Sequence, residues 1–141
     1  MHVGRRRVVI VGGGASGMVA AIAAAREGAQ VTVLEQKENL GKKILSTGNG
    51  RCNMTNLKMD DGCYRGGESG FAQRVIGHFP VADTLAFFGG LGILTRERNG
   101  YVYPYPEQAS AVLEGLLLEI RHLGIQVQTG CPVRRIRRNR E

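Results

Sequence analysis

The sequence lacks tryptophan, has only three cysteines and contains no long apolar run. Cys52, Cys63 and Cys131 are odd in number and include no C-x-x-C pair, so we expect reduced thiols, with neither a disulfide framework nor a metal site. No segment approaches the roughly 18 apolar residues of a membrane span, which predicts a soluble protein. The start, MHVGRRRVVIVGGG, turns to glycine after a short apolar run and has no cleavage site. It predicts a cytoplasmic protein without an export signal.

Acidic residues are scarce enough to leave a formal net charge of +7, but the imbalance lies at the two ends of the chain. Without the arginines of residues 5–7 and the charged residues of 134–141, 11 basic and 11 acidic residues remain. No aromatic residues alternate with these arginines to stack on bases. We therefore expect solvated ends, and neither nucleic acid nor a membrane as a partner.

Glycine is abundant, at 21 of 141 residues, and stands next to apolar segments, which indicates turns and close backbone contacts. RVVIV (7–11) is a β-branched run typical of a central parallel strand that is buried on both faces. ASGMVAAIAAAREGA (15–29) follows, a stretch rich in small helix formers and closed by Gly28 at the C′ position, and then a second β-branched strand, QVTVLE (30–35). Strand, helix and strand in this order predict a βαβ unit and an α/β, Rossmann-like fold.

The turn between the first strand and the helix reads G-x-G-x-x-G, the fingerprint of dinucleotide-binding βαβ units. Gly12 makes the tight turn, Gly14 lets the backbone approach a pyrophosphate, and Gly17 lets helix and strand pack closely. The helix directs its unpaired N–H groups at the phosphates. Glu35, at the end of the second strand, is placed to accept hydrogen bonds from a ribose, and its charge disfavours the 2′-phosphate of NADP.

A basic loop follows the second strand. LGKKILSTGNGRCNMTN (40–56) has no helical or strand period, and residues 39–59 contain four cations and no acidic residue. The loop leaves the carboxyl end of a strand, where ligands bind in open α/β folds. Gly48-Asn49-Gly50 can form a nest of backbone N–H groups, and Lys42, Lys43 and Arg51 can neutralise a diphosphate. The alternative is a disordered, solvated loop.

Two segments resemble one known family. G-K-K-x-L-x-T-G-N-G-R-C-N-x-T-N (41–56) strongly resembles the signature of the YhiN/BaiN-like flavoproteins, also called aminoacetone-oxidase-like FAD-dependent oxidoreductases. FFGGLGILTRERNGYVYPYPEQASAVLEGL (87–116) is similar to a later segment of that family. Tyr101 stands where the family pattern has arginine, and Pro106 where it has serine. Family members are much longer, so the resemblance implies that residues 1–141 are the amino-terminal part of an FAD-binding domain.

The resemblance implies FAD as the cofactor and an oxidoreductase that transfers a hydride through the flavin. It also implies a small-molecule substrate, with NAD(P)H as a candidate electron donor. Sheet edges left exposed would be covered by the rest of the family's chain or by self-association. The catalytic residues stay unknown. The expected cofactor-binding residues are Gly12, Gly14, Ala15, Ser16, Gly17, Glu35, Lys42, Lys43, Thr47, Gly48, Asn49, Gly50, Arg51 and Asn53.

The residues by themselves leave two other functions open. One is an NAD-dependent dehydrogenase module, which would not need the basic loop. The other is a catalytically inactive binding module that uses the arginine-rich ends. Within the expected domain, 1–37 form the βαβ unit, 38–59 the basic loop and 68–141 the remaining elements. The patterns predict helices over 69–79, 81–88 and 107–124, a hairpin over 93–103 turning at Asn99-Gly100, a third strand at 125–129 and the start of another at 131–141.

Overall fold

The computed structural model describes residues 6–68 and 70–138, and the chain divides into two compact units. The first unit takes in residues up to Ile44 and from Leu116 onward. The second unit comprises Leu45–Gly115. Helix α4 (Ala109–His122) begins in the second unit and ends in the first.

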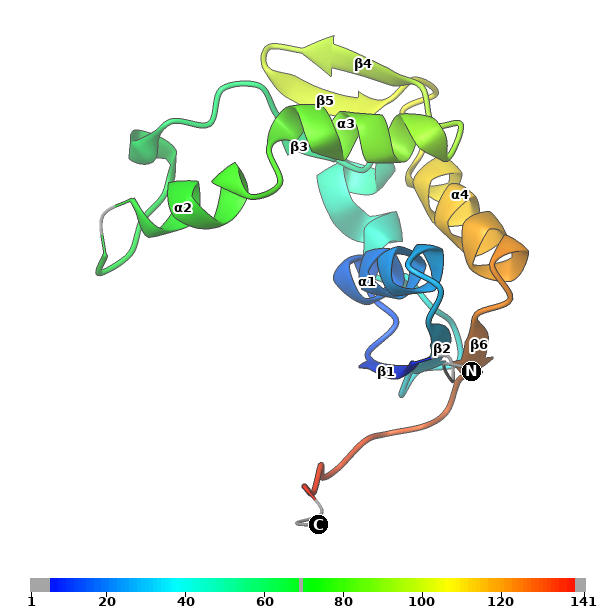
Figure 1. Ribbon diagram of the computed structural model, residues 1–141. Helices are drawn as coiled ribbons and strands as arrows, with labels where there is room; N and C mark the ends of the chain where they lie inside the picture. Colours follow the sequence, from blue (N-terminus) through cyan, green and yellow to red (C-terminus); the bar gives the residue numbers. More distant parts are fainter. Residues whose placement is uncertain (1–5, 69, 139–141) are drawn as a thin grey trace. The chain divides into compact units, whose positions relative to one another are not determined.

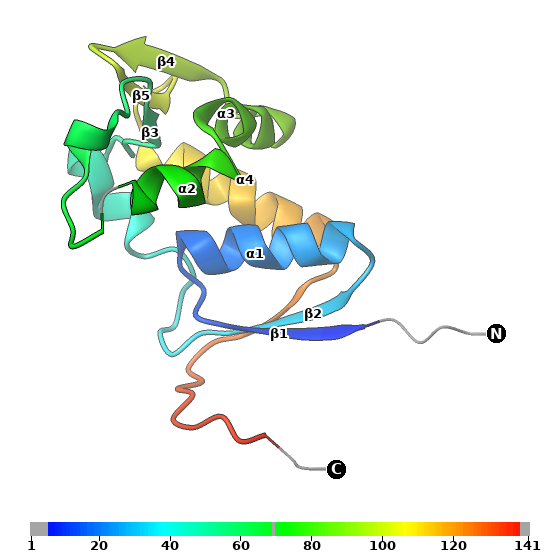
Figure 2. The ribbon, with the colours of Figure 1, turned by 60° about the vertical axis from the view of Figure 1, so that its left-hand side comes forward.

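The first unit is built on a parallel sheet. Its strands are β1 (Arg7–Val11), β2 (Gln30–Leu34) and β6 (Gln126–Gln128), in the order β1-β2-β6. Helix α1 (Ala15–Arg26) connects β1 to β2 and runs along one face of these strands (Figure 2). The predicted α/β fold, its βαβ unit and its third strand are confirmed.

The core of the first unit lies between α1 and the sheet. Met18 and Ile22 are fully buried on one stripe of α1, and Val31 and Val33 are the buried residues of β2. The alternation in β2 follows from the strand period, which sends every second side chain toward the helix. Arg26 of α1 also donates a 2.8 Å hydrogen bond through Nη2 to the Glu119 carboxylate of α4.

The prediction that β1 is a central strand buried on both faces is wrong. β1 is an edge strand, β2 is the middle strand, and Val9 and Val11 are 58% and 53% exposed. The run RVVIV is apolar on both faces, but α1 covers only the face that carries Ile10. Periodicity alone could not reveal that the other face of β1 is uncovered in this chain.

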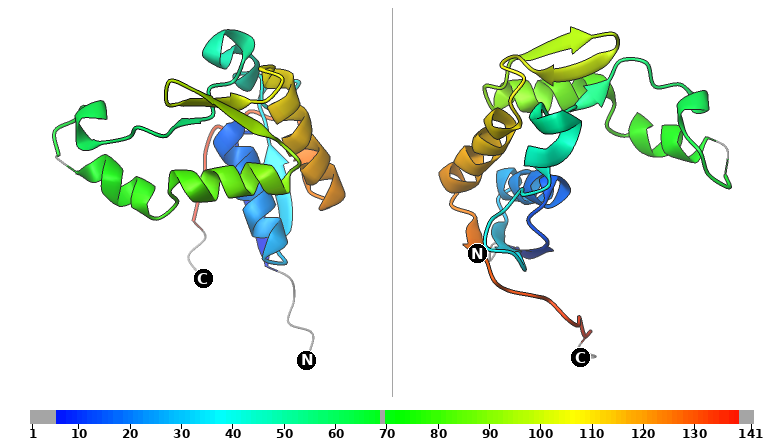
Figure 3. Two further views of the ribbon diagram at one scale, coloured as in Figure 1. Left: turned by 90° about the horizontal axis from the view of Figure 1, so that it is seen from above. Right: turned by 180° about the vertical axis from the view of Figure 1, so that it is seen from behind.

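The second unit contains an antiparallel sheet of three strands, β3 (Thr55–Asn56), β4 (Thr95–Arg98) and β5 (Tyr101–Pro104). Their order in the sheet is β3-β5-β4. The β4–β5 hairpin turns at Asn99 and Gly100, whose φ angles of 54° and 89° are those of the predicted turn. Helix α3 (Val81–Gly90) lies beside this hairpin (Figures 1 and 3). The other elements of this unit are the 3-10 helices η1 (Ile44–Gly50) and η2 (Asp61–Cys63) and the helix α2 (Phe71–Gly77).

Two further expectations about local structure are wrong. The basic loop is not irregular throughout, because it contains η1 and β3. Its backbone pairs with the hairpin through Met54 N–H to Val102 O and Leu57 N–H to Gly100 O, both 2.8 Å. Because these partners are distant in the sequence, their pairing produces no periodic pattern in the loop from which it could be predicted. Residues 131–138 form no strand, and the rest of that predicted strand lies outside the described residues.

None of the helices in the described ranges has the length and apolar character required to cross a membrane.

We expect Gly17→Ala to destabilise the first unit strongly. A Cβ at this position would lie 1.9 Å from the Gly12 carbonyl oxygen, a backbone atom that cannot rotate away. The loss of folding free energy should reach or exceed the roughly 1–3 kcal/mol typical of overpacking. Urea unfolding measures it. Gly14→Ala is the matched control, because a Cβ there meets no atom within 4 Å and should leave stability nearly unchanged.

Candidate functional site

The glycine turn between β1 and α1 has the geometry that the sequence predicts. Gly12 has a φ of +98°, which L side chains rarely adopt, and its N–H donates to Leu34 O at 2.8 Å. Gly17 packs against the Gly12 carbonyl. Gly14 is exposed and faces open space at the position where a Cβ would stand. The turn therefore leaves room for a ligand at Gly14 and for none at Gly17.

The amino end of α1 opens onto the same space. Gly14 is the N-cap residue and supplies no side-chain cap, and Ala15 and Ser16 are exposed. The first N–H groups of a helix have no intrahelical acceptor and carry a partial positive charge. An anionic group beside Gly14 would accept hydrogen bonds from these N–H groups and balance their partial positive charge, as phosphates do at helix amino ends.

Glu35 anchors the other side of this site. Its carboxylate is only 8% exposed and accepts two backbone hydrogen bonds: Oε2 from the Gly13 N–H at 2.6 Å and Oε1 from the Lys37 N–H at 2.8 Å. The Gln36 N–H also interacts with this carboxylate. A carboxylate has about four acceptor positions, so these contacts leave acceptor capacity for a hydroxyl group. Glu35 thus holds the glycine turn and retains the capacity to bind a ribose.

The two backbone hydrogen bonds also shift the acidity of Glu35. The N–H of Lys37, followed by that of Gly13, lowers the pKa of the Glu35 carboxyl, and burial opposes them only in part. A carboxylate that accepts several N–H bonds is stabilised in its charged form. The site therefore carries a negative charge at neutral pH, which suits a ribose diol and disfavours a phosphate at that position.

Sequence reasoning missed one wall of the site. A pocket of about 220 Å³ at the carboxyl ends of β1 and β2 is lined by Glu35 and by residues from the segment that follows β6. The Cys131 N–H donates to Glu35 O at 2.8 Å, and the Gly130 N–H donates to Lys37 O at 3.0 Å. Only the tertiary fold brings this segment to Glu35. The lining residues are Val11, Gly12, Leu34, Glu35, Gln36, Cys131 and Val133.

The first part of the basic loop belongs to the first unit and contacts the glycine turn. The Gly41 N–H donates to Gly13 O at 2.8 Å. Leu40 is buried so close to Gly13 that a Cβ on Gly13 would lie 2.0 Å from Leu40 Cδ2. Lys42 and Lys43 follow directly and are exposed. The structure therefore brings the start of the loop to the turn, as the sequence predicts.

The second part of the basic loop belongs to the second unit and forms a left-handed turn. Gly48, Asn49 and Gly50 have φ angles of 54°, 53° and 80°, and Cys52 has 58°. The turn is closed by the Arg51 N–H to Gly48 O and the Cys52 N–H to Thr47 O, both 3.1 Å. Thr47 and Gly48 are half-buried, whereas Asn49, Gly50 and Asn53 are exposed.

Arg51 has partners within the second unit. Its Nε donates to Gly48 O at 3.3 Å, its guanidinium lies over the Tyr103 ring at 5.1 Å, and Nη1 is 3.9 Å from Glu107 Oε2. The expectation that this side chain neutralises a diphosphate stays a prediction. The contacts add a structural role that the sequence did not indicate.

The cysteines do not form a redox pair in the described part of the chain. Cys52, Cys63 and Cys131 are free, and burial raises the pKa of the Cys52 thiol. A thiol with a raised pKa is a poor nucleophile at neutral pH. No group of His, Cys, Asp or Glu side chains among the described residues could hold a metal ion.

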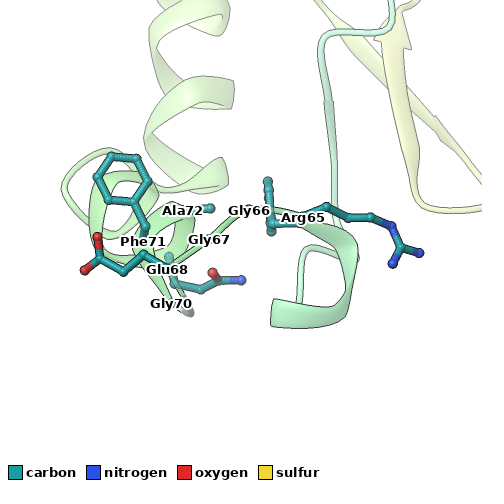
Figure 4. Close-up of a pocket in the computed structure, with 9 residues that line it drawn as sticks. Arg65, Gly66, Gly67, Glu68, Gly70, Phe71 and Ala72 are labelled. Carbon is teal, nitrogen blue, oxygen red and sulfur yellow. The ribbon is translucent and has the colours of Figure 1, made fainter.

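A larger pocket, of about 650 Å³, lies in the second unit along residues 64–68 and 70–73. Figure 4 shows Phe71 and Glu68 on one side, with the Arg65 side chain extending away from them. None of the cofactor-binding residues predicted from the sequence lines it. The smaller pocket, in contrast, is lined by two of those residues, Gly12 and Glu35.

The profile of the HI0933-like protein Rossmann domain matches residues 6–141. The chain belongs to this family. Family membership and the parallel sheet together confirm the predicted Rossmann class and the family resemblance.

Several curated proteins are similar to this member of the HI0933-like family. A 3-dehydro-bile acid delta(4,6)-reductase of Clostridium scindens is 54% identical over 129 residues, which is 90% of this chain and 32% of the relative. A ribosomal RNA dihydrouridine synthase of Escherichia coli is 32% identical over 64% of this chain and 23% of the relative. One from Haemophilus influenzae is 28% identical over 92% of this chain and 32% of the relative. The chain thus spans at most about a third of these relatives.

Two solved structures share the fold. THI4 of Thermovibrio ammonificans superposes with a TM-score of 0.54 at 19% identity, covering 89% of this chain and 38% of that one. A 3-ketosteroid-delta4-(5alpha)-dehydrogenase of Rhodococcus jostii RHA1 gives 0.50 at 14% identity, with 92% and 39% covered. At these identities the likeness concerns the fold alone.

We expect Glu35 to make stability depend on pH. Because its folded-state pKa is lowered, its contribution is present above the unfolded-state pKa and is lost as the pH falls through the folded-state pKa. Glu35→Gln should therefore be less stable than wild type at neutral pH and should lose less stability on acidification. Urea unfolding at several pH values measures both effects.

The control for this variant is Glu38→Gln, whose side chain is exposed, and which should keep wild-type stability at neutral pH. Parallel pH profiles for wild type and Glu35→Gln would contradict the role assigned to the Glu35 carboxylate.

Proposed function

We propose that the protein is an FAD-dependent oxidoreductase and that residues 1–141 are part of its FAD-binding domain. The observation that carries the proposal is the open space at Gly14 beside the Glu35 carboxylate, in a turn whose other glycines are committed to the fold. A pyrophosphate fits at Gly14 and the helix end, and a ribose fits at Glu35. Membership in the HI0933-like Rossmann family supports the assignment.

FAD explains the basic loop better than NAD does. The proposed contacts in the first unit are Gly12, Gly14–Gly17, Glu35, Lys42 and Lys43. Those in the second unit are Thr47–Arg51 and Asn53. A dehydrogenase that binds only NAD at the G-x-G-x-x-G turn has no need of a glycine-rich cationic segment after the second strand. When bound, the flavin supplies hydride transfer, and the residues of this chain position it and balance its charge.

The relatives' names suggest a common reaction class. A delta(4,6)-reductase and a dihydrouridine synthase are both named for the reduction of carbon–carbon double bonds. We propose that the substrate holds a double bond conjugated to a carbonyl group, since conjugation makes the β-carbon an acceptor of hydride. The relative at 54% identity favours a small polycyclic enone. A uracil base of RNA is the second candidate, favoured by the relatives at 32% and 28% identity.

The remaining proposals concern partners and location. The exposed Val9 and Val11 on the uncovered face of β1 would be buried by the rest of a longer chain or by self-association. NAD(P)H is the proposed electron donor, because reduction of a substrate requires a supply of hydride. The protein is proposed to act in the cytoplasm.

Gly14→Val should abolish FAD binding and preserve the fold. Gly14 has a φ of −74° and no neighbour within 4 Å of a Cβ, so the branched side chain causes no internal clash and occupies only the ligand's space. Calorimetric titration of the complete protein with FAD measures binding, and unfolding measures stability. The matched control is Gly89→Val, which adds the same side chain at another open position. Wild-type affinity in Gly14→Val would rule out this turn as the pyrophosphate site.

The substrate class is tested with the reduced, FAD-loaded complete protein under anaerobic conditions. A 3-oxo-4,6-diene steroid should reoxidise the flavin, which absorbance at the flavin bands follows, and uridine-containing ribosomal RNA should not. Rapid reoxidation by the RNA alone would establish the second candidate. Absence of bound flavin would instead favour an NAD-dependent or inactive binding module.

A further inference from the structure

An ionic cluster in the second unit has no role in the function proposed so far. Glu107, between β5 and α4, is flanked by three arginines and its side chain is only 18% exposed. Its Oε1 accepts from Arg98 Nη2 at 2.7 Å and from Arg96 Nη1 at 3.3 Å, and its Oε2 is 3.9 Å from Arg51 Nη1. One carboxylate thus holds together three guanidinium groups that would otherwise repel one another.

Arg51 differs from the other two arginines because it also contacts the left-handed turn of the basic loop. Its Nε donates to the Gly48 carbonyl at 3.3 Å, and its backbone N–H donates to the same oxygen at 3.1 Å. Its guanidinium lies over the ring of the buried Tyr103. Arg96 stacks instead on Tyr105, at 4.4 Å, and Arg98 belongs to the far end of β4. Of the three arginines around Glu107, Arg51 is therefore the one that links it to the turn.

The turn needs such support. Asn49 and Cys52 adopt positive φ angles without being glycine, a costly conformation that persists only where the surroundings hold it. Gly48 is also packed tightly, since a Cβ there would lie 2.8 Å from the Asn53 nitrogen. Glu107 itself has a φ of 52°. Strained residues at both ends of the Arg51 bridge indicate that the arrangement is maintained by tertiary contacts and not by local preference.

We propose that Glu107 is a positioning residue for the cofactor: through Arg51 it holds the Gly48-Asn49-Gly50 turn in the conformation whose backbone N–H groups bind an anionic or carbonyl oxygen of FAD. This inference rests on the proposed function. Arg51 is then held by Glu107 and Tyr103 in the first place, and any contact of its guanidinium with the cofactor is secondary. The other arginines around Glu107 stabilise the carboxylate without touching the turn.

The test compares Glu107→Gln with Arg98→Gln in the complete protein. Glu107→Gln keeps the shape and removes the charge that holds Arg51, so FAD should bind about tenfold more weakly, an effect of the size usual for coupled residues in contact. Arg98→Gln removes the arginine that lies nearest to the Glu107 carboxylate but leaves the contact between Glu107 and Arg51. FAD affinity should therefore stay within about twofold. Lys58→Ala, at an exposed cation of the same loop, should likewise have little effect.

Hydrogen exchange locates the effect. In wild type, the amides of Gly48, Asn49 and Gly50 should gain protection when FAD binds, and in Glu107→Gln this gain should be lost. The amides of Met54 and Leu57, which donate to the hairpin, should stay protected in every variant and report that the second unit is folded. The absorbance bands of bound flavin should also shift in Glu107→Gln, a change that a loss of stability alone would not produce.

Arg51→Lys gives an independent route to the same result. Lysine keeps the charge but lacks the Nε and the planar fork that join Gly48 to Glu107, so it should weaken FAD as Glu107→Gln does. The double variant should be no weaker than either single variant. If Glu107→Gln fails to fold, Glu107→Asp carries the test, because it leaves Arg51 unchanged and moves the charge away from it.

The outcomes separate the inference from the function on which it rests. Wild-type protein that binds no FAD would overturn the proposed function. Wild-type protein that binds FAD, with Glu107→Gln and Arg51→Lys both matching Arg98→Gln, would overturn the positioning role and leave the function intact.

Discussion

The hydrogen bond from the Gly13 N–H to the Glu35 carboxylate holds the first unit together at the proposed binding site. It ties the glycine turn after β1 to the end of β2, and Gly41 secures the other side of the same turn through Gly13 O. The turn is thereby fixed before any ligand arrives, so binding need not order it. The same charged carboxylate lines the pocket in which the proposed function places a ribose. One buried carboxylate therefore holds the fold together at the proposed site.

In the second unit a turn is also held in place by tertiary contacts, but these come from an arginine side chain. The left-handed run from Gly48 to Cys52 cannot rely on glycine alone, because Asn49 and Cys52 share the conformation. An arginine, a buried tyrosine ring and a shared carboxylate supply the missing support. A guanidinium suits this position, since its planar fork can meet a carbonyl and a carboxylate while its face rests on a ring. These contacts fix the backbone of a segment whose sequence has no regular period.

The glycines of the first turn show how a motif divides its work. Gly12 is required by its backbone angle and Gly17 by the carbonyl against it, and both requirements belong to the fold. Gly14 meets neither requirement: its φ of −74° is an ordinary one, and a Cβ there would meet no atom within 4 Å. The structural requirement thus differs from one glycine of the motif to the next.

Sequence alone determined the βαβ unit, the tasks of Gly12 and Gly17, the place of Glu35 at a strand end and the hairpin at Asn99-Gly100. These follow from local periodicity and from backbone angles that few residues adopt, so neighbours in the chain suffice to read them. Only the tertiary structure decided that β1 lies at the edge of the sheet, that Cys131 and Val133 wall the pocket beside Glu35, and that Arg51 reaches Glu107. Each depends on segments far apart in the chain, and the side chains involved have no period that marks their partners. The sequence does not show which arginines contact Glu107, because a carboxylate can pair with any arginine. The fold determines which arginines lie close to it.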